Sequence, residues 1–586
     1  MTTGRVSARE VIALVADDFV PLPHEERPSG PDAPLGWPGY DAARARAAER
    51  TGESESVVCG AATVAGVRAV LIAFEFGFLG GSLGERTGDR LVAAYTYARE
   101  HRLPVVPLVA TGGSRMQEGM LALTQLQRVA RESALTREAG LPQVAVLRDP
   151  TTGGGWATLG AGADVVLALP GAQVGFAGSR VRPPDADPAA YTAEAQVAAG
   201  AADAVVPAAE LRDVLGLWLR LLTDCRTPAD GSPPLDGGPA ADAGSTADAG
   251  SAADAGSAAD GGPAADAGST ADAGSTADAG SAADGGPAAD AGSTADGDSR
   301  TDEGSRTESG PVDDKGPATG GSSAPHAGSP PDASPPPDAS PSPDAGPSPD
   351  NAPAAGGDVV PAPVPGALGE VGLPLTGWDA VRRARSAGRP RAGAYLDAYF
   401  TRRLAISGDR CGGVDPDGML CGFGVHEGRT VAYAAQTGAA TRPAGYRTAV
   451  RLIRLAERLG IPVLTLVDTP GAANDAEAER QGVGAAIAEL FGVVAAARTP
   501  VTTLVIGEGG SGGALALAAP GRTWATPDSY FSVIAPEAAA AILKRPPEQT
   551  EATADQLRIR PQDLVELGVI RATNARGTRD NGEHRP

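Results

Sequence analysis

The chain has 586 residues, enough for two or more domains with a sizeable core. Hydrophobic residues make up 42% of it but aromatic residues only 4%, so its cores must rest on Ala, Val and Leu. The net charge of −23 argues against nucleic acid as a partner. The 4 cysteines are far apart and form no CxxC pair, which argues against a zinc ribbon and against a disulfide framework, so we expect no bound metal and a reducing cytoplasm.

The N-terminal segment has neither the apolar core of a signal peptide nor a run long enough to span a membrane. Short helices are predicted over 6–15, with Ser7 as N-cap, and over 41–51. A first block from 56 to 223 alternates short apolar runs with helical stretches. The expected strands are 69–74, 105–110, 143–147 and 165–169, and the expected helices are 88–101, 117–138 and 211–222. This βαβ rhythm predicts a mostly parallel sheet covered by helices.

The segment 226–357 is different in kind. Asp recurs at every sixth position from Asp236 to Asp296, and Ala, Gly, Ser, Thr and Pro fill the gaps before a Pro-rich tract. A six-residue repeat is compatible with a β-helix, but without Val, Ile and Leu that helix has no interior. Because burial cannot offset the entropy of ordering here, we expect a long, disordered, acidic linker.

A second block from about 373 to 575 repeats the rhythm of the first. Its expected helices are 378–386, 442–459 and 482–497, and its expected strands are 430–435, 463–467 and 501–506. The sequence therefore predicts two α/β domains of related plan, 1–225 and 358–586, joined by the linker 226–357.

Two glycine-rich turns stand out. The stretch 501–516 is predicted to be a strand, a tight glycine turn and a helix start, and 105–119 repeats that plan. Such turns expose backbone N–H groups that suit a developing oxyanion. The alternative for each turn is tight packing of a helix on a sheet.

Other functions of these turns are less well supported. GxGxxG occurs at 507–512 but lacks the acidic residue expected of a dinucleotide-binding unit, and no phosphate-binding P-loop motif is present. A hydrolase built on Ser511 and His426 is the alternative, although the chain has only 5 histidines.

Nine short motifs resemble the carboxyltransferase component of bacterial acetyl-CoA carboxylase, with a β-like half followed by an α-like half. The β-like motifs are 76–84 (FGFLGGSLG), 111–119 (TGGSRMQEG), 147–155 (LRDPTTGGG) and 174–181 (VGFAGSRV). The α-like motifs are 408–410 (GDR), 442–447 (RPAGYR), 467–472 (VDTPGA), 507–514 (GEGGSGGA) and 530–537 (YFSVIAPE). The resemblance implies two domains of the ClpP/crotonase superfamily.

The resemblance also implies a reaction. Carboxybiotin, carried on a biotin carboxyl carrier protein that works with a biotin carboxylase, gives its carboxyl group to acetyl-CoA or a related acyl-CoA, which yields malonyl-CoA for fatty acid synthesis. No cofactor would be bound permanently. Gly112 and Gly113 are expected to stabilise the thioester enolate, and Gly513 and Ala514 the ureido oxygen of biotin.

Further residues of these motifs are expected to bind substrate. They are Gly80, Gly81, Gly154, Gly155, Phe176, Ala177, Gly178, Arg180, Arg442, Tyr446, Arg447, Pro470, Gly471, Gly510, Gly512 and Tyr530. The arginines are candidates for the CoA phosphates, although a solvated or ion-paired helix face is the alternative for each. Arg115, Glu118, Glu479 and Arg480 are expected to fix local structure instead.

Departures from the family pattern leave choices open. The four-cysteine zinc ribbon that usually opens the β subunit has no counterpart, and Ala535 and Ala538 replace a usual Ser and Gly. The substrate can therefore be another acyl-CoA. A decarboxylase of malonyl thioesters and a non-catalytic subunit of a carboxylase complex are the alternative functions. A homodimer is expected, with the active site formed by the halves of one chain or of two.

Overall fold

The computed structural model describes residues 5–24, 30–223 and 359–574, and these belong to one compact unit. The linker predicted over 226–357 lies outside the described residues. The described part of the first half contains one eight-stranded sheet. Its strands are β1 (Asp18–Pro21), β2 (Val57–Val64), β3 (Val67–Phe74), β4 (Val105–Thr111), β5 (Val144–Thr152), β6 (Val165–Ala168), β7 (Val174–Gly175) and β8 (Ala204–Val205).

Helices connect and cover these strands. They are α1 (Ala8–Val15), α2 (Tyr40–Thr51), α3 (Glu85–His101), α4 (Gly119–Glu138), α5 (Gly153–Gly155), α6 (Ala193–Ala198) and α7 (Leu211–Thr223). Short 3₁₀ turns are η1 (Leu79–Gly81), η2 (Met116–Glu118) and η4 (Pro188–Tyr191), and η3 (Trp156–Gly160) is a π-helical turn. The predicted N-cap is confirmed: Ser7 Oγ accepts the N–H of Glu10, and the Glu10 carboxylate accepts the N–H of Ser7.

The second half forms another eight-stranded sheet from its described residues. Its strands are β9 (Arg402–Ile406), β10 (Met419–His426), β11 (Arg429–Gln436), β12 (Val463–Thr469), β13 (Val501–Gly510), β14 (Thr523–Ala525), β15 (Tyr530–Ser532) and β16 (Ala572–Thr573). Its helices are α8 (Gly377–Arg385), α9 (Ala392–Tyr399), α10 (Pro443–Arg458), α11 (Ala476–Arg480), α12 (Val483–Ala496), α13 (Ser511–Leu515), α14 (Pro536–Ile542), α15 (Thr550–Gln556) and α16 (Pro561–Glu566), with a 3₁₀ turn η5 (Pro547–Gln549).

The two sheets have the same topology. The order β1-β2-β3-β4-β5-β6-β8, with β7 beside β5, matches β9-β10-β11-β12-β13-β14-β16, with β15 beside β13. In each sheet the first three strands pair antiparallel and the rest pair parallel. Both sheets even shift register at the same place, after Val109 in β4 and after Val467 in β12. The prediction of two α/β domains of related plan is confirmed.

The central strands are apolar because both of their faces are covered. Every residue of β4 and of β12 is buried, as is typical of parallel strands between helical layers. The predicted strands over 105–110, 463–467 and 501–506 are confirmed by β4, β12 and β13. The antiparallel strands β2 and β10 were not predicted, since interspersed glycines weaken their apolar pattern.

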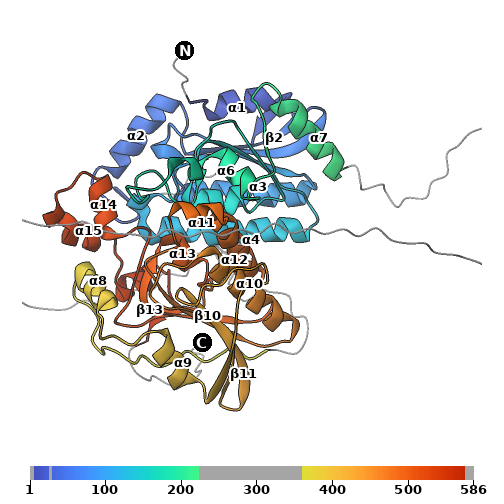
Figure 1. Cartoon of the computed structure of the whole chain (residues 1–586). Coiled ribbons are helices and arrows are strands. Elements are labelled where there is room, and N and C mark those ends of the chain that lie inside the picture. Colours follow the sequence, from blue (N-terminus) through green and yellow to red (C-terminus); the bar gives the residue numbers. More distant parts are fainter. Residues whose placement is uncertain (1–4, 25–29, 224–358, 575–586) are drawn as a thin grey trace, which may run out of the picture. The chain divides into compact units, whose positions relative to one another are not determined.

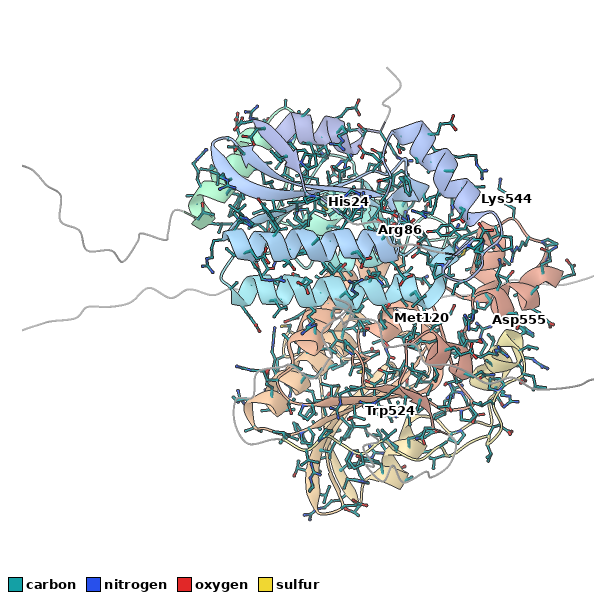
Figure 2. The ribbon with its side chains drawn as sticks, turned by 180° about the vertical axis from the view of Figure 1, so that it is seen from behind. His24, Arg86, Met120, Trp524, Lys544 and Asp555 are labelled. Atoms are coloured by element: carbon teal, nitrogen blue, oxygen red, sulfur yellow. The ribbon has the colours of Figure 1, made fainter. Side chains whose placement is uncertain are left out.

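Helices α4 and α12 join the halves. They pack against each other (Figure 1). In addition, α4 of the first half contacts α13 of the second, and α12 of the second half contacts η3 of the first, so each helix also touches the segment that follows the fifth strand of the other sheet. Figure 2 shows α3 and α4 running side by side, with the second half against α4. At the joint, Gln127 donates from Nε2 to the carbonyl of Ala518 at 2.8 Å, and Tyr191 donates to the carbonyl of Asn474 at 2.8 Å. The halves of one chain therefore form a continuous interface.

Candidate functional site

A cavity of about 760 Å³ lies where the halves meet. The first half lines it with segments after β3, β4, β5 and β7, and the second half with segments after β12, β13 and β15. Loops at the carboxyl ends of strands are where α/β sheets bind ligands. The predicted site residues on its wall are Gly80, Gly112, Gly113, Gly154, Phe176, Ala177, Gly178, Arg180, Pro470, Gly471 and Gly512. Both predicted turns therefore meet in one cavity within one chain.

The turn after β4 presents an N–H group that was not predicted. The N–H of Gly112 donates to the carbonyl of Gly80 at 2.9 Å, and that of Gly113 donates to Thr111 Oγ1 at 3.1 Å. These two donors are therefore occupied, which differs from the prediction that they face an oxyanion. The N–H of Ser114 has no acceptor within the described residues, and Ser114 lines the cavity.

The turn after β12 has the same construction. The N–H of Gly471 donates to Thr469 Oγ1 at 3.2 Å, as that of Gly113 does to Thr111. Gly471, with φ 141°, and Gly113, with φ 103°, both need the backbone freedom of glycine. The next N–H, from Ala472, finds no acceptor in the described part of the chain. Ser114 and Ala472 are therefore equivalent donors.

The helix starts after β5 and β13 form the second pair of equivalent segments. β5 runs into α5 at Gly153, and β13 runs into α13 at Ser511; no side chain caps either helix. Because first-turn N–H groups have no partner inside a helix, they remain available to a ligand. Gly154 and Gly512 both reach the cavity. The structural counterpart of the turn after β13 is thus the turn after β5. The similarity of the two glycine-rich stretches in the sequence had instead paired it with the turn after β4.

Gly513 and Ala514 do not line the cavity. The carbonyl of Gly513 accepts from Tyr446 Oη at 3.1 Å and from Gln436 Nε2 at 3.2 Å, which fixes the start of α13. A Cβ on Gly513 would lie 2.4 Å from the nitrogen of Ala472. Close approach of the two backbone segments therefore requires glycine at this position. Tyr446 does not line the cavity and instead supports the start of α13 through its hydrogen bond to Gly513.

Buried ionic networks hold both turns. In the first half, Arg115 donates to the carboxylates of Glu55 and Glu118 and to the carbonyl of Ser82, and its side chain is 1% exposed. Burial by itself would raise the pKa of Glu55, but the Arg115 guanidinium overcomes this and lowers that pKa to about 2. Arg115 and Glu118 thus fix the turn, in agreement with their expected role.

In the second half the corresponding anchor is Asp468, whose carboxylate is fully buried. It accepts from Arg389 at 2.5 Å, from Arg391 at 3.3 Å and from the N–H of Glu508 at 3.2 Å. It thereby ties the ends of β12 and β13 together, directly before the segments that line the cavity.

Of the predicted CoA-binding arginines, only Arg180 lines the cavity, and its exposed side chain has no partner within the described residues. Arg442 pairs with Asp475 at 3.2 Å and Arg447 with Asp409 at 2.8 Å. Both are thus ion-paired on a helix face, the alternative that the sequence left open. Arg5, which was not predicted, also lines the cavity and lies over the Phe76 ring.

The remaining predicted residues lie behind the wall. A Cβ on Gly81 would lie 2.1 Å from the carbonyl oxygen of Ala110, one on Gly155 would lie 2.4 Å from Thr111 Cγ2, and one on Gly510 would lie 2.0 Å from the carbonyl oxygen of Pro470. These glycines permit close packing. Tyr530 is 2% exposed and donates to Glu508 at 2.8 Å, so it supports β13 rather than the cavity.

The hydrolase alternative is not supported by the geometry. Ser511 lines the cavity, but His426 stacks on the Tyr399 ring at 3.7 Å and its Nδ1 bonds the Tyr399 carbonyl oxygen at 2.7 Å. The described residues contain no cluster of His, Cys, Asp and Glu that could hold a metal ion, and no helix among them is long and apolar enough to cross a bilayer.

Comparisons with known proteins identify both halves as carboxyltransferase domains. Residues 38–222 match the family model "Carboxyl transferase domain", and residues 368–575 match "Acetyl co-enzyme A carboxylase carboxyltransferase-like". The acetyl-coenzyme A carboxylase carboxyl transferase subunits beta/alpha of Salinispora arenicola is 33% identical over 541 residues, which span 89% of this chain and 73% of that one. The chain belongs to the acetyl-CoA carboxylase carboxyltransferase family, and the resemblance with the β-like half first is confirmed.

Further comparisons cover either one half or nearly the whole chain. The carboxyl transferase subunit alpha of a Methylobacterium species is 42% identical over 231 residues, 37% of this chain and 72% of that one. Among solved structures, transcarboxylase 12S aligns with 99% of this chain and 92% of its own at 16% identity and a TM-score of 0.33. The β subunit of P. aeruginosa geranyl-CoA carboxylase aligns with 96% and 80% at 18% identity and a TM-score of 0.30.

Proposed function

We propose that this chain transfers a carboxyl group from carboxybiotin, carried on a biotin carboxyl carrier protein, to acetyl-CoA, giving malonyl-CoA. Family membership supports the reaction class. The single structural observation that carries the proposal is that two equivalent sets of backbone donors, one from each half, open into the same cavity. A reaction that creates two oxyanions needs two such sets.

The first-half donors are the N–H groups of Ser114 and of the helix start at Gly154, and they stabilise the thioester enolate. The second-half donors are those of Ala472 and of the helix start at Gly512, and they stabilise the ureido oxygen of the carboxyl donor. The proposed donor of the first half is therefore the residue after the predicted Gly112 and Gly113. In the second half, the predicted Gly513 and Ala514 do not donate to the oxyanion but pack behind the residues that do.

The atoms of the transfer balance without a side-chain base. The bond between the carboxyl carbon and the ureido nitrogen of the donor breaks, and that nitrogen accepts the α-proton of the acetyl group. A new carbon–carbon bond then forms at the α-carbon. What the chain supplies is orientation and charge stabilisation.

Binding of a CoA ester is supported by Arg180, which lines the cavity and whose exposed guanidinium has no ion-pair partner in the described part of the chain and can bind a phosphate. The partners proposed are a biotin carboxyl carrier protein and a biotin carboxylase, in a cytoplasmic complex that contains the chain as a homodimer. The linker 226–357 is proposed to be a disordered tether between domains 1–225 and 358–586.

The test is the forward reaction with the full chain. Carrier protein bearing labelled carboxybiotin is mixed with acetyl-CoA or propionyl-CoA, and labelled product is measured. Labelled malonyl-CoA is expected. Label found only in methylmalonyl-CoA would keep the mechanism and change the substrate. Release of CO₂ from malonyl-CoA without any transfer would favour the decarboxylase alternative, and neither reaction in a folded protein would favour a non-catalytic subunit.

A further inference from the structure

Glu479 is a buried carboxylate that joins the halves beside the cavity. It lies in α11 of the second half, is 1% exposed, and its Oε1 accepts the N–H of Ala177 of the first half at 3.0 Å. Helix α11 packs against η4 and α6 of the first half, and Figure 1 shows α11 next to α6. The Phe176 N–H of the first half and the Gln196 side chain of α6 also act on this carboxylate as hydrogen-bond donors. Its donors therefore come from the first half, so this one buried group ties α11 to the segment that contains Ala177.

The segment that Glu479 holds is part of the cavity wall. Phe176, Ala177 and Gly178 all line the cavity. The Phe176 ring reaches within 3.5 Å of the place where a Cβ on Gly512 would be, so it packs directly beside the second helix start. Gly175, just before this segment, leaves room for the carboxylate, because a Cβ there would lie 3.1 Å from Glu479 Oε1.

We propose that Glu479 is a positioning residue that, in its charged form, holds the wall segment 176–178 against the second helix start and releases it on protonation. The physical basis is that a hydrogen bond to a charged acceptor is roughly twice as strong as one to a neutral acceptor. Only the activity readout below depends on the proposed function.

The environment places this change of charge within the ordinary assay range. Burial raises the pKa of Glu479 to about 7, although the N–H groups of Ala177 and Phe176, the Arg182 guanidinium and the Gln196 side chain act in the opposite direction. The other groups that face it are Tyr191 from η4, the neutral Gln196 from α6, and Asp475 and Arg480 at the ends of its own helix. The Arg182 guanidinium interacts with the carboxylate electrostatically and also lies over the Tyr191 ring, 3.9 Å from its centroid.

The test compares Glu479→Gln, which keeps the shape and one acceptor oxygen, with Glu477→Gln on the exposed side of the same helix. The KM for acetyl-CoA and kcat are measured from about pH 5.5 to about pH 8.5. In the parent protein KM is expected to rise about fivefold as pH falls through about 7, with kcat changing less. Glu479→Gln is expected to lose this pH dependence, and Glu477→Gln to keep it. An unchanged pH dependence in Glu479→Gln would overturn the proposal.

A second readout needs no enzymatic activity. Amide hydrogen exchange of the peptide that contains Ala177 is measured by mass spectrometry at about pH 8, where the carboxylate is charged. Exchange about tenfold faster in Glu479→Gln than in the parent and in Glu477→Gln is expected. Equal exchange in all three would overturn the positioning role. This result stands even if the chain transfers no carboxyl group, so the two proposals fail separately.

Discussion

Gly153 and Ser511 occupy equivalent positions, each the first residue of the helix that follows the fifth strand of its sheet, and both have a left-handed backbone. Their φ angles are 68° and 55°. This conformation is ordinary for glycine, but it costs a residue with a side chain about 1–2 kcal/mol. In the second half this backbone strain is present at Ser511, which lines the cavity.

Exchanging the two residue types is predicted to have unequal effects. Ser511→Gly removes the strain but loosens the unfolded chain, so the free energy of unfolding should change by less than about 1 kcal/mol and activity should be kept. Gly153→Ser places a Cβ 3.1 Å from the Cα of Gly113 and should lower carboxyl transfer about tenfold or more. Denaturant unfolding and transfer assays on both variants check this. Equal losses in the two variants would show that the positions are not built alike.

The joint between the halves depends on Gly484 in α12. A Cβ at that residue would lie 2.0 Å from Trp156 Nε1, so Gly484→Ala should destabilise the chain by about 1–3 kcal/mol through overpacking. Gly492 on the same helix has nothing within 4 Å of the equivalent position, and Gly492→Ala should be neutral or stabilising by up to about 1 kcal/mol. Thermal unfolding of the two variants checks this, with a lower melting temperature expected for Gly484→Ala than for Gly492→Ala. Equal melting temperatures would contradict the packing of Gly484 against Trp156.

Arg180 is predicted to bind the phosphates of CoA. Arg180→Ala should raise the KM for acetyl-CoA about tenfold while kcat changes little, because the contact is the same in the ground and transition states. Arg442→Ala removes an arginine that is already paired with Asp475 away from the cavity, and it should leave KM unchanged. Steady-state kinetics with acetyl-CoA and with a phosphate-free acetyl thioester separates the cases. If both arginines matter equally, or if the truncated substrate shows the same effect, Arg180 does not bind phosphate.

Glu479 also predicts a pH-dependent stability. Its pKa is raised from 4.5 to about 7 by burial, so the folded state keeps the proton to higher pH than the unfolded chain does. The contribution of Glu479 to the free energy of unfolding is therefore fully present below about pH 4.5. It is lost as pH rises to about 7, which lowers the free energy of unfolding by up to about 3 kcal/mol. Glu479→Gln should accordingly be more stable than the parent at pH 8 and equal to it at pH 4.5. Unfolding free energies at both values check the sign, and a less stable variant at pH 8 would refute it.

Much of the fold follows from local patterns. The apolar runs that become β4, β12 and β13 and the capped helix α1 are specified by their own residues. The equivalence of the two halves is not visible in this way, because Gly153 and Ser511 differ in type and only the sheet topology shows that they correspond. The two glycine-rich turns that look alike in sequence are not structural equivalents, because one follows the fourth strand of its sheet, β4, and the other follows the fifth, β13.

The candidate site was predicted in outline but not in its donors. Glycine clusters reveal where backbone comes close to a ligand, yet which N–H is free depends on partners elsewhere, such as the Gly80 carbonyl that occupies Gly112. Ser114 and Ala472 carry no compositional signal of their own. Glu479 acts across the interface on Ala177, 302 positions away in the sequence, and no pattern within α11 could have shown that.

The most direct test of the account is the reverse transfer of labelled carboxylate from malonyl-CoA to biocytin by the purified full chain. Gly512 lines the cavity at the second helix start, and a valine there would fill the space beside Phe176 and cover the N–H groups. Gly393 in α9 has nothing within 4 Å of a Cβ and serves as control. Transfer by the parent and by Gly393→Val, with a loss of at least about a hundredfold in Gly512→Val of unchanged fold, is the predicted result. Full transfer by Gly512→Val, or none by the folded parent protein, would contradict the account.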